Sequence, residues 1–200
     1  PTNTPEPSNT PEPTAPQEPT LSPTPKPTFT VGSTKIREKD GMTMVYVPAG
    51  EFLMGNPTRT ETTGDYWIDQ TEVTVEMYKK CADEGACDLD GVKNDYTVRA
   101  TNYYLNEENN KYAATGVTWF EADNYCKWAG GRLPTHEEWE KAGRGPNGYL
   151  YPWGNEYSLT NIKSGDTIGK IGNVGRFSEN RSYYGVFDMV GNAMEWVNDE

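Results

Sequence analysis

Long apolar runs and basic residues are both scarce in this sequence. No stretch of its 200 residues reaches the roughly 18 consecutive apolar residues that a membrane-spanning helix needs, so we expect no such segment within them. Lys and Arg total 18 against 30 Asp and Glu, which gives a formal net charge of −12. This imbalance disfavours nucleic acids and anionic membrane surfaces as partners. It identifies no ligand, because ordinary solubility accounts for an acidic surface equally well.

The N-terminal segment differs in composition from the rest of the chain. Ten of the fifteen prolines fall between Pro1 and Pro27, whereas all six tryptophans lie beyond Asp65. Proline, threonine, serine and glutamate bury little apolar surface, so such a segment cannot offset the entropy lost on ordering. We therefore expect a disordered, low-complexity, polyproline-II-biased spacer over residues 1–33 and a folded domain over residues 34–200. A plain tail, a glycosylated stalk and a linker from a membrane anchor are all open interpretations of this spacer.

Short strands are expected at the beginning of the domain. Residues 42–55 are rich in β-branched, aromatic and aliphatic residues on both sides of a Pro48–Gly50 breaker. This pattern predicts two strands joined by a turn, that is, a hairpin. Residues 66–69 predict one more short strand.

Three threonines mark the beginnings of helices. Thr74 precedes apolar residues spaced by three and four, which predicts a helix over residues 75–84. Thr118 and Thr135 each stand three residues before a glutamate, which is the spacing of a capping box. Each is therefore expected to begin a helix.

Each of the two later helices is expected to bury one apolar stripe. The stripe of the first helix consists of Trp119, Ala122, Cys126 and Ala129. The second helix is expected to turn Trp139 and Ala142 inward and to end near Gly143. His136, the only histidine, stands at its beginning and is interpreted as a surface residue.

The chain after Gly143 is rich in aromatic residues and glycine and has almost no helical periodicity, so we expect loops and short strands. Buried loops need partners for their carbonyl groups, and a region rich in Asn and Asp suggests bound cations. The predicted fold class is α+β, with little regular secondary structure, short strands, two or three short helices and long ordered loops.

Three cysteines allow at most one internal disulfide. Cys81 stands at the end of a predicted helix and Cys87 in the next loop, which favours a structural disulfide over a metal-binding thiol pair. Cys126 lies on an apolar stripe, where cysteine usually acts as a small hydrophobic residue. A disulfide favours an extracytoplasmic location: secreted, periplasmic or surface-displayed. Because the chain begins at Pro1, we expect its signal or anchor to be absent from this sequence.

Five blocks of sequence, in order, resemble the formylglycine-generating enzyme family, also called the sulfatase-modifying factor family. They are residues 47–55, 68–74, 117–140, 151–154 and 185–196. The most specific pieces are Arg132-Leu133-Pro134-Thr135 and Gly191-Asn192-Ala193-Met194-Glu195-Trp196. The resemblance implies a C-type-lectin-like fold.

The resemblance also implies two calcium sites. One would use the side chains of Asp188 and Glu195 with the carbonyls of Gly191 and Ala193. The other would use the side chains of Asn161 and Asp166 with the carbonyls of Ile162 and Ile168. Calcium prefers hard oxygen ligands of these types. The turn signal at Gly191-Asn192 lets the chain bring Asp188 and Glu195 toward one point. The alternative is that Asp188 only bonds a turn and Glu195 faces solvent.

Members of this family use a pair of cysteines to bind copper and oxidise a sulfatase cysteine to Cα-formylglycine with O₂. In the family that pair lies beyond the position of Glu200. The resemblance therefore implies a domain that is incomplete at its C-terminus, with no catalytic residue in this chain and with copper only in the complete enzyme. The expected partner is a cysteine-containing sulfatase peptide.

Two other functions compete with this oxidoreductase. The same scaffold serves in non-catalytic modules that bind a protein or peptide ligand or act as sensors, and the spacer suits a domain displayed on a stalk. Iron-dependent enzymes that join sulfur to histidine derivatives need a histidine cluster, and this sequence has only His136.

Overall fold

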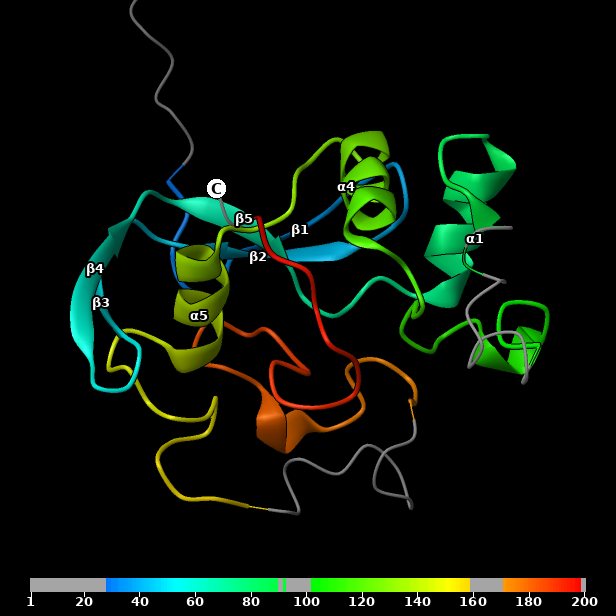
Figure 1. Ribbon diagram of the computed structural model, residues 1–200. Helices are drawn as coiled ribbons and strands as arrows, with labels where there is room; N and C mark the ends of the chain where they lie inside the picture. The colour runs from blue at the N-terminus through cyan, green and yellow to red at the C-terminus, as the bar shows by residue number, and fades with distance from the viewer. Residues whose placement is uncertain (1–27, 90–91, 93–101, 159–170, 199–200) are drawn as a thin grey trace, which may run out of the picture.

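The computed structural model describes residues 28–89, 92, 102–158 and 171–198. Within them, two small antiparallel sheets and three α-helices pack beside a large irregular region (Figure 1). The strands are β1 (Thr34–Ile36), β2 (Thr43–Val47), β3 (Gly50–Met54), β4 (Arg59–Thr63) and β5 (Tyr66–Asp69). The helices are α1 (Val75–Asp83), α4 (Trp119–Trp128) and α5 (His136–Arg144), with 3-10 turns η1 (Glu107–Asn109) and η2 (Ser178–Asn180). The predicted α+β class is confirmed.

The strands on either side of Pro48 belong to different sheets, so the predicted hairpin is wrong. β2 lies between β1 and β5 in a three-stranded sheet, whereas β3 pairs with β4. Val47 is opposite Tyr66, and Gly50 is opposite Thr63. The link lacks an Asn-Gly or Gly-first turn, and Gly50, with φ of 139°, turns the chain away from β2.

The predicted helix beginnings are confirmed. Thr74 accepts a hydrogen bond from the backbone of Met77, and capping boxes join Thr118 to Glu121 and Thr135 to Glu138. Helix α1 ends at Asp83, one residue before the predicted end.

Helix α5 ends near Gly143, as predicted. It finishes at Arg144, and Gly145 leaves it with φ of 70°. Gly143 remains helical in a tight contact, because a Cβ atom there would lie 3.1 Å from the terminal methyl group of Met189.

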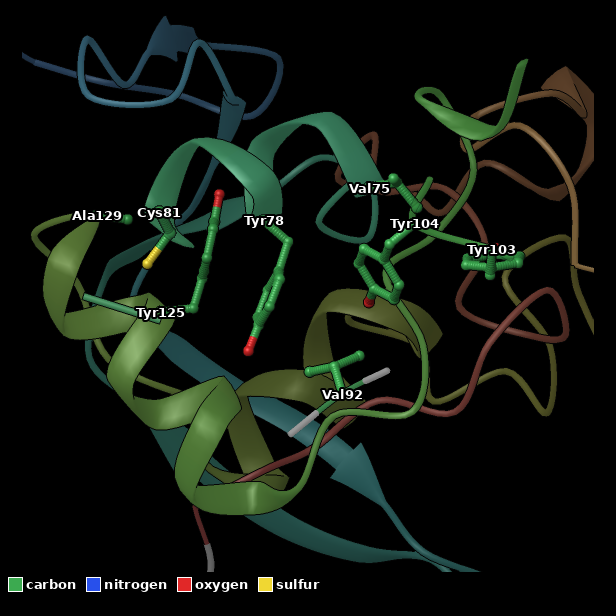
Figure 2. Packing of buried hydrophobic residues seen from close by; sticks show 8 residues of the cluster. All are labelled: Val75, Tyr78, Cys81, Val92, Tyr103, Tyr104, Tyr125 and Ala129. Atoms are coloured by element: carbon green, nitrogen blue, oxygen red, sulfur yellow. The ribbon is translucent and has the colours of Figure 1, made fainter. Parts of the chain in front are cut away.

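One hydrophobic core lies between α1 and α4 (Figure 2). The rings of Tyr78 and Tyr125 stack with centroids 6.0 Å apart. Tyr125, which the predicted stripe omitted, is the most buried side chain of α4, while Cys126 is only partly buried. The reason is that the tyrosine hydroxyl finds a polar partner, Asp40 Oδ2, at 2.6 Å. A large ring can then enter the core without an unsatisfied polar group.

A second core lies between the three-stranded sheet and α5. Its buried members are Val45, Val47, Ala142, Tyr184, Val186 and Met189. Ala142 is completely buried and Trp139 packs against this cluster, so both face inward as predicted.

The N-terminal end of the described chain packs against two aromatic residues of the three-stranded sheet. Phe29, inside the predicted spacer, packs against Tyr46 and Trp67, with ring centroids 5.6 and 5.0 Å away. The rest of the spacer, residues 1–27, lies outside the described residues.

After α5, the described chain forms loops, bridges and η2, as expected from its composition. In the part of the chain that is described, no helix has the length and apolar character required to cross a bilayer.

A disulfide joins Cys81, in the last turn of α1, to Cys87 in the following loop, with the two Cα atoms 5.3 Å apart. This is the pair favoured from the sequence. It leaves Cys126 as the free cysteine.

Candidate functional site

The segment from Asp188 to Glu195 folds back on itself. Asp188 and Asn192 adopt left-handed backbone conformations with φ of 59° and 53°, and Gly191 has φ of 99°. Asn and Asp tolerate this region better than other residues with side chains, and glycine does so without cost. The expected turn at Gly191-Asn192 therefore forms, and it brings the segment against Glu72, which follows β5.

Asp188 is held inside this loop by hydrogen bonds. Asp188 is only 4% exposed. Oδ2 accepts a hydrogen bond from the backbone of Gly175, and Oδ1 accepts one from Asn180 Nδ2 at 3.4 Å. The carboxylate is thus oriented by two segments of the irregular region.

Glu72 contacts the loop from the segment after β5 and is 9% exposed. Its Oε1 accepts a hydrogen bond from the backbone of Ala193 at 3.3 Å, while Oε2 has no hydrogen-bond partner among the described residues. Burial, followed by the negative charges of Asp188 and Glu195, raises the pKa of Glu72 to about 9.

Glu195 lies at the outer end of the loop and is exposed. Its Oε2 accepts a hydrogen bond of 2.6 Å from Trp139 Nε1, which fastens the loop to α5. The structure brings Asp188 and Glu195 to the surroundings of Glu72, yet among the described residues no three acidic, histidine or cysteine side chains converge closely enough to hold a metal alone. A cation here would need backbone carbonyls as well.

Such carbonyls are present in the loop. In the described part of the chain, the carbonyl oxygens of Gly191 and Ala193 accept no hydrogen bond. With Asp188 and Glu195 they form the oxygen set implied by the resemblance. The second implied set, Asn161, Ile162, Asp166 and Ile168, lies outside the described residues.

Sequence reasoning missed Glu72. It stands two residues before the Thr74 cap. The only sequence feature that could have drawn attention to it is its place in the block Ile68 to Thr74, which resembles the family. Its role could not be read from spacing, because the partner Ala193 is 121 residues away.

A groove of about 370 Å³ lies beside this loop. It is lined by β5, the partly buried face of α4, Trp139 of α5 and residues 193–196. The Cys126 thiol faces it, and burial, followed by the negative charge of Asp69, raises the pKa of this thiol to about 12. The thiol therefore remains protonated at neutral pH, which makes it a poor nucleophile and a poor metal ligand.

The cysteines do not fit a copper centre. All three lie in the described residues, and two of them are joined to each other. Cys126 alone cannot supply the pair of thiolates that a soft Cu(I) ion would need.

Comparisons with known proteins agree with the resemblance. The family model for the sulfatase-modifying factor enzyme 1-like domain matches residues 29–200. The inactive Cα-formylglycine-generating enzyme 2 of Bos taurus is 39% identical over 99 residues, covering 44% of this chain and 33% of that protein. The serine/threonine-protein kinase Pkn1 of Chlamydia trachomatis serovar L2 is 31% identical over 175 residues, covering 78% of this chain and 28% of that protein. The formylglycine-generating enzyme of Bos taurus is 38% identical over 99 residues, covering 42% of this chain and 26% of that protein.

The solved structure of PvdO from Pseudomonas aeruginosa superposes with a TM-score of 0.62 and 23% identity, covering 86% of this chain and 76% of that chain. At this identity the likeness shows the fold alone. The chain spans 26 to 33% of the length of the three sequence relatives. The match of the family model over residues 29–200 shows that the chain belongs to the sulfatase-modifying factor, or formylglycine-generating enzyme, family.

Proposed function

We propose that these residues are the scaffold and cation-holding part of a formylglycine-generating-enzyme-type domain, and that they do not oxidise a sulfatase cysteine by themselves. The observation that carries this proposal is the state of the cysteines. The disulfide removes Cys81 and Cys87, and Cys126 is a single protonated thiol at the side of a groove. In the complete protein, the proposed activity is the copper- and O₂-dependent conversion of a sulfatase cysteine to Cα-formylglycine.

The cation we propose is calcium, held by the loop from Asp188 to Glu195. Two observations support it: the carbonyls of Gly191 and Ala193 accept no hydrogen bond from the described residues, and the buried Glu72 Oε2 has no partner among them. All the available donors are hard oxygens, which suit Ca²⁺ better than transition metals. Bound calcium would supply fixed positive charge that holds the loop against α5 and β5, so its role is to order the irregular region. A second calcium at Asn161, Ile162, Asp166 and Ile168 is part of the same proposal.

A second candidate is a non-catalytic module that binds a protein or peptide ligand outside the cytoplasm. The lack of a free thiol pair among the cysteines favours it, and one similar protein carries the word inactive in its name. The two candidates share the scaffold and the cation site, and they differ in the chemistry of the complete protein.

The activity part is tested with a cysteine-containing sulfatase peptide, copper, a reductant and air. Mass spectrometry of the peptide after incubation with the 200-residue chain should show no aldehyde above the level without protein. Aldehyde that disappears in Cys126→Ala would overturn the proposal and assign redox chemistry to that thiol.

A further inference from the structure

Glu72 and Asp188 are two buried acidic residues at the same loop, since Glu72 Oε1 accepts a hydrogen bond from the Ala193 amide and the charge of Asp188 acts on Glu72. In the described part of the chain, neither residue takes part in an ion pair with Lys, Arg or His. Two adjacent buried carboxylates repel each other strongly, so a proton or a cation must separate them. An additional positive charge at this point, from a proton or a cation, would offset that repulsion.

The surroundings favour a cation over a proton. A shared proton would satisfy one carboxyl oxygen, but a second acceptor without a partner is present beside the pair. Asn180 is 3% exposed and its Nδ2 donates to Asp188 Oδ1, but its own Oδ1 has no hydrogen-bond partner in the described part of the chain. Among the described residues, Glu72 Oε2 and Asn180 Oδ1 are thus two buried oxygens without partners near Asp188. Buried polar atoms without partners are rare, and a cation coordinated by several oxygens would account for both of these oxygens.

We propose that Glu72 is a direct ligand of the cation at the Asp188–Glu195 loop, through Oε2, and that it joins the segment after β5 to that loop across the ion. This inference rests on the calcium site of the proposed function and adds to it a ligand from a distant part of the chain. Oε1 of the same carboxylate keeps the Ala193 amide in place. One side chain would thereby both bind the ion and hold Ala193, a residue of the same loop.

The test compares three variants that each remove one negative charge. Glu72→Gln and Asp188→Asn alter the two buried carboxyls, and Glu76→Gln alters an exposed glutamate on the first turn of α1 as the matched control. The 200-residue chain is freed of metal with a chelator and titrated with CaCl₂. Calorimetric titration gives the Kd, and thermal melts with calcium or with excess chelator give the shift in Tm, because an ion that binds only the folded state raises Tm. Circular dichroism in chelator establishes that each variant is folded.

The expected result is a calcium-dependent rise in Tm in the unaltered chain and in Glu76→Gln. Glu72→Gln should bind calcium roughly 10- to 100-fold more weakly, and Asp188→Asn should be weakened similarly. If Asp188→Asn loses the shift while Glu72→Gln binds as the unaltered chain does, Glu72 is not a ligand and only this inference fails. If the unaltered chain shows no calcium dependence and Glu72→Gln is more stable than it, a shared proton occupies the pair and the calcium proposal fails as well.

Glu72→Asp keeps the test decisive if Glu72→Gln does not fold. It retains the charge and withdraws the carboxylate by one methylene. A direct ligand predicts weaker calcium binding in this variant, whereas an affinity equal to that of the unaltered chain would overturn direct ligation.

Discussion

The Nζ atom of Lys141 lies 2.8 Å from the carbonyl oxygen of Pro48. It also donates to the Gly50 carbonyl and to Thr63 Oγ1, both at 2.9 Å, and the residue is only 1% exposed. All these acceptors are neutral oxygens. Burial lowers the pKa of Lys141, and the three hydrogen bonds offset part of the cost of burying the ammonium. A single side chain of α5 therefore holds the link between the two sheets.

Lys141→Met should destabilise the fold, because it removes the ammonium donor from the partly buried Pro48 and Gly50 carbonyls and from the buried Thr63 hydroxyl. The expected loss in the free energy of unfolding is about 1–3 kcal/mol, measured by urea denaturation. Lys127→Met, which alters an exposed lysine of α4, is the control and should change it by no more than about 0.5 kcal/mol. Equal stability of Lys141→Met and the unaltered chain would mean that the ammonium is not needed at the link.

Removing the disulfide should cost a modest amount of stability. The bridge closes a short loop, with six residues of sequence separation, and loop entropy predicts a stabilisation of about 2 kcal/mol. We expect the double variant Cys81→Ala with Cys87→Ala to unfold at lower urea concentration than the oxidised chain, and to be unaffected by reductant. Peptide mapping without reductant checks the pairing directly. Free thiols at both positions in protein from an oxidising medium would contradict the bridge and weaken the argument for an extracytoplasmic location.

The hydroxyl of Tyr125 should contribute to stability in a pH-dependent way. Burial alone would raise the pKa of Asp40, but hydrogen bonds from Arg37, Tyr125 and the Met42 amide outweigh it and hold that pKa below its usual value. A carboxyl with a lowered folded-state pKa stabilises the fold above its unfolded pKa of about 3.9. This stability is lost as the pH falls through the folded-state pKa.

Tyr125→Phe should therefore be less stable than the unaltered chain by about 1.5–3 kcal/mol at pH 7, with a smaller difference near pH 3. Tyr104→Phe is the matched control, because its hydroxyl donates to the neutral carbonyl of Thr115 at 2.9 Å. Its smaller effect should be the same at both pH values. Urea denaturation at each pH measures both, and a Tyr125→Phe difference that does not change with pH would separate Tyr125 from the charge of Asp40.

Two glycines with positive φ should respond differently to alanine. At Gly148, with φ of 61°, a Cβ atom would lie 2.4 Å from Leu53 Cβ and 2.7 Å from its carbonyl oxygen. At Gly130, with φ of 85°, nothing lies within 4 Å of that position. Gly130→Ala should cost about 1–2 kcal/mol from backbone strain alone, and Gly148→Ala should cost distinctly more. Thermal melts that rank the two variants in the opposite order would contradict the close approach to Leu53.

Features that depend on neighbours in sequence could be predicted, and features that depend on distant partners could not. The capping boxes at Thr118 and Thr135 need only four consecutive residues each, and both form. The strands on the two sides of Pro48 lie where the sequence predicts them. Their pairing differs from the predicted hairpin, because it depends on β4 and β5 further along the chain.

The candidate site divides in the same way. The turn at Gly191-Asn192 follows from local residue preferences, and it forms. Glu72 enters the site through chain folding, and no local pattern distinguishes it from other glutamates that precede a helix cap. Tyr125 was missed on α4 for a related reason, since its burial depends on Asp40 in a separate loop.

The crossing of the chain between sheets at Pro48 has a consequence for the order of folding. Strands β3 and β4 form a local pair that is inserted between β2 and β5, which pair with each other. Because the β3–β4 hairpin lies within the loop between β2 and β5, it can form first at a small entropic cost. The β2–β5 pair then closes a loop that the hairpin has already shortened. Mutations that weaken β3–β4 pairing should slow refolding, whereas mutations in the loop from Asp188 to Glu195 should mainly speed unfolding.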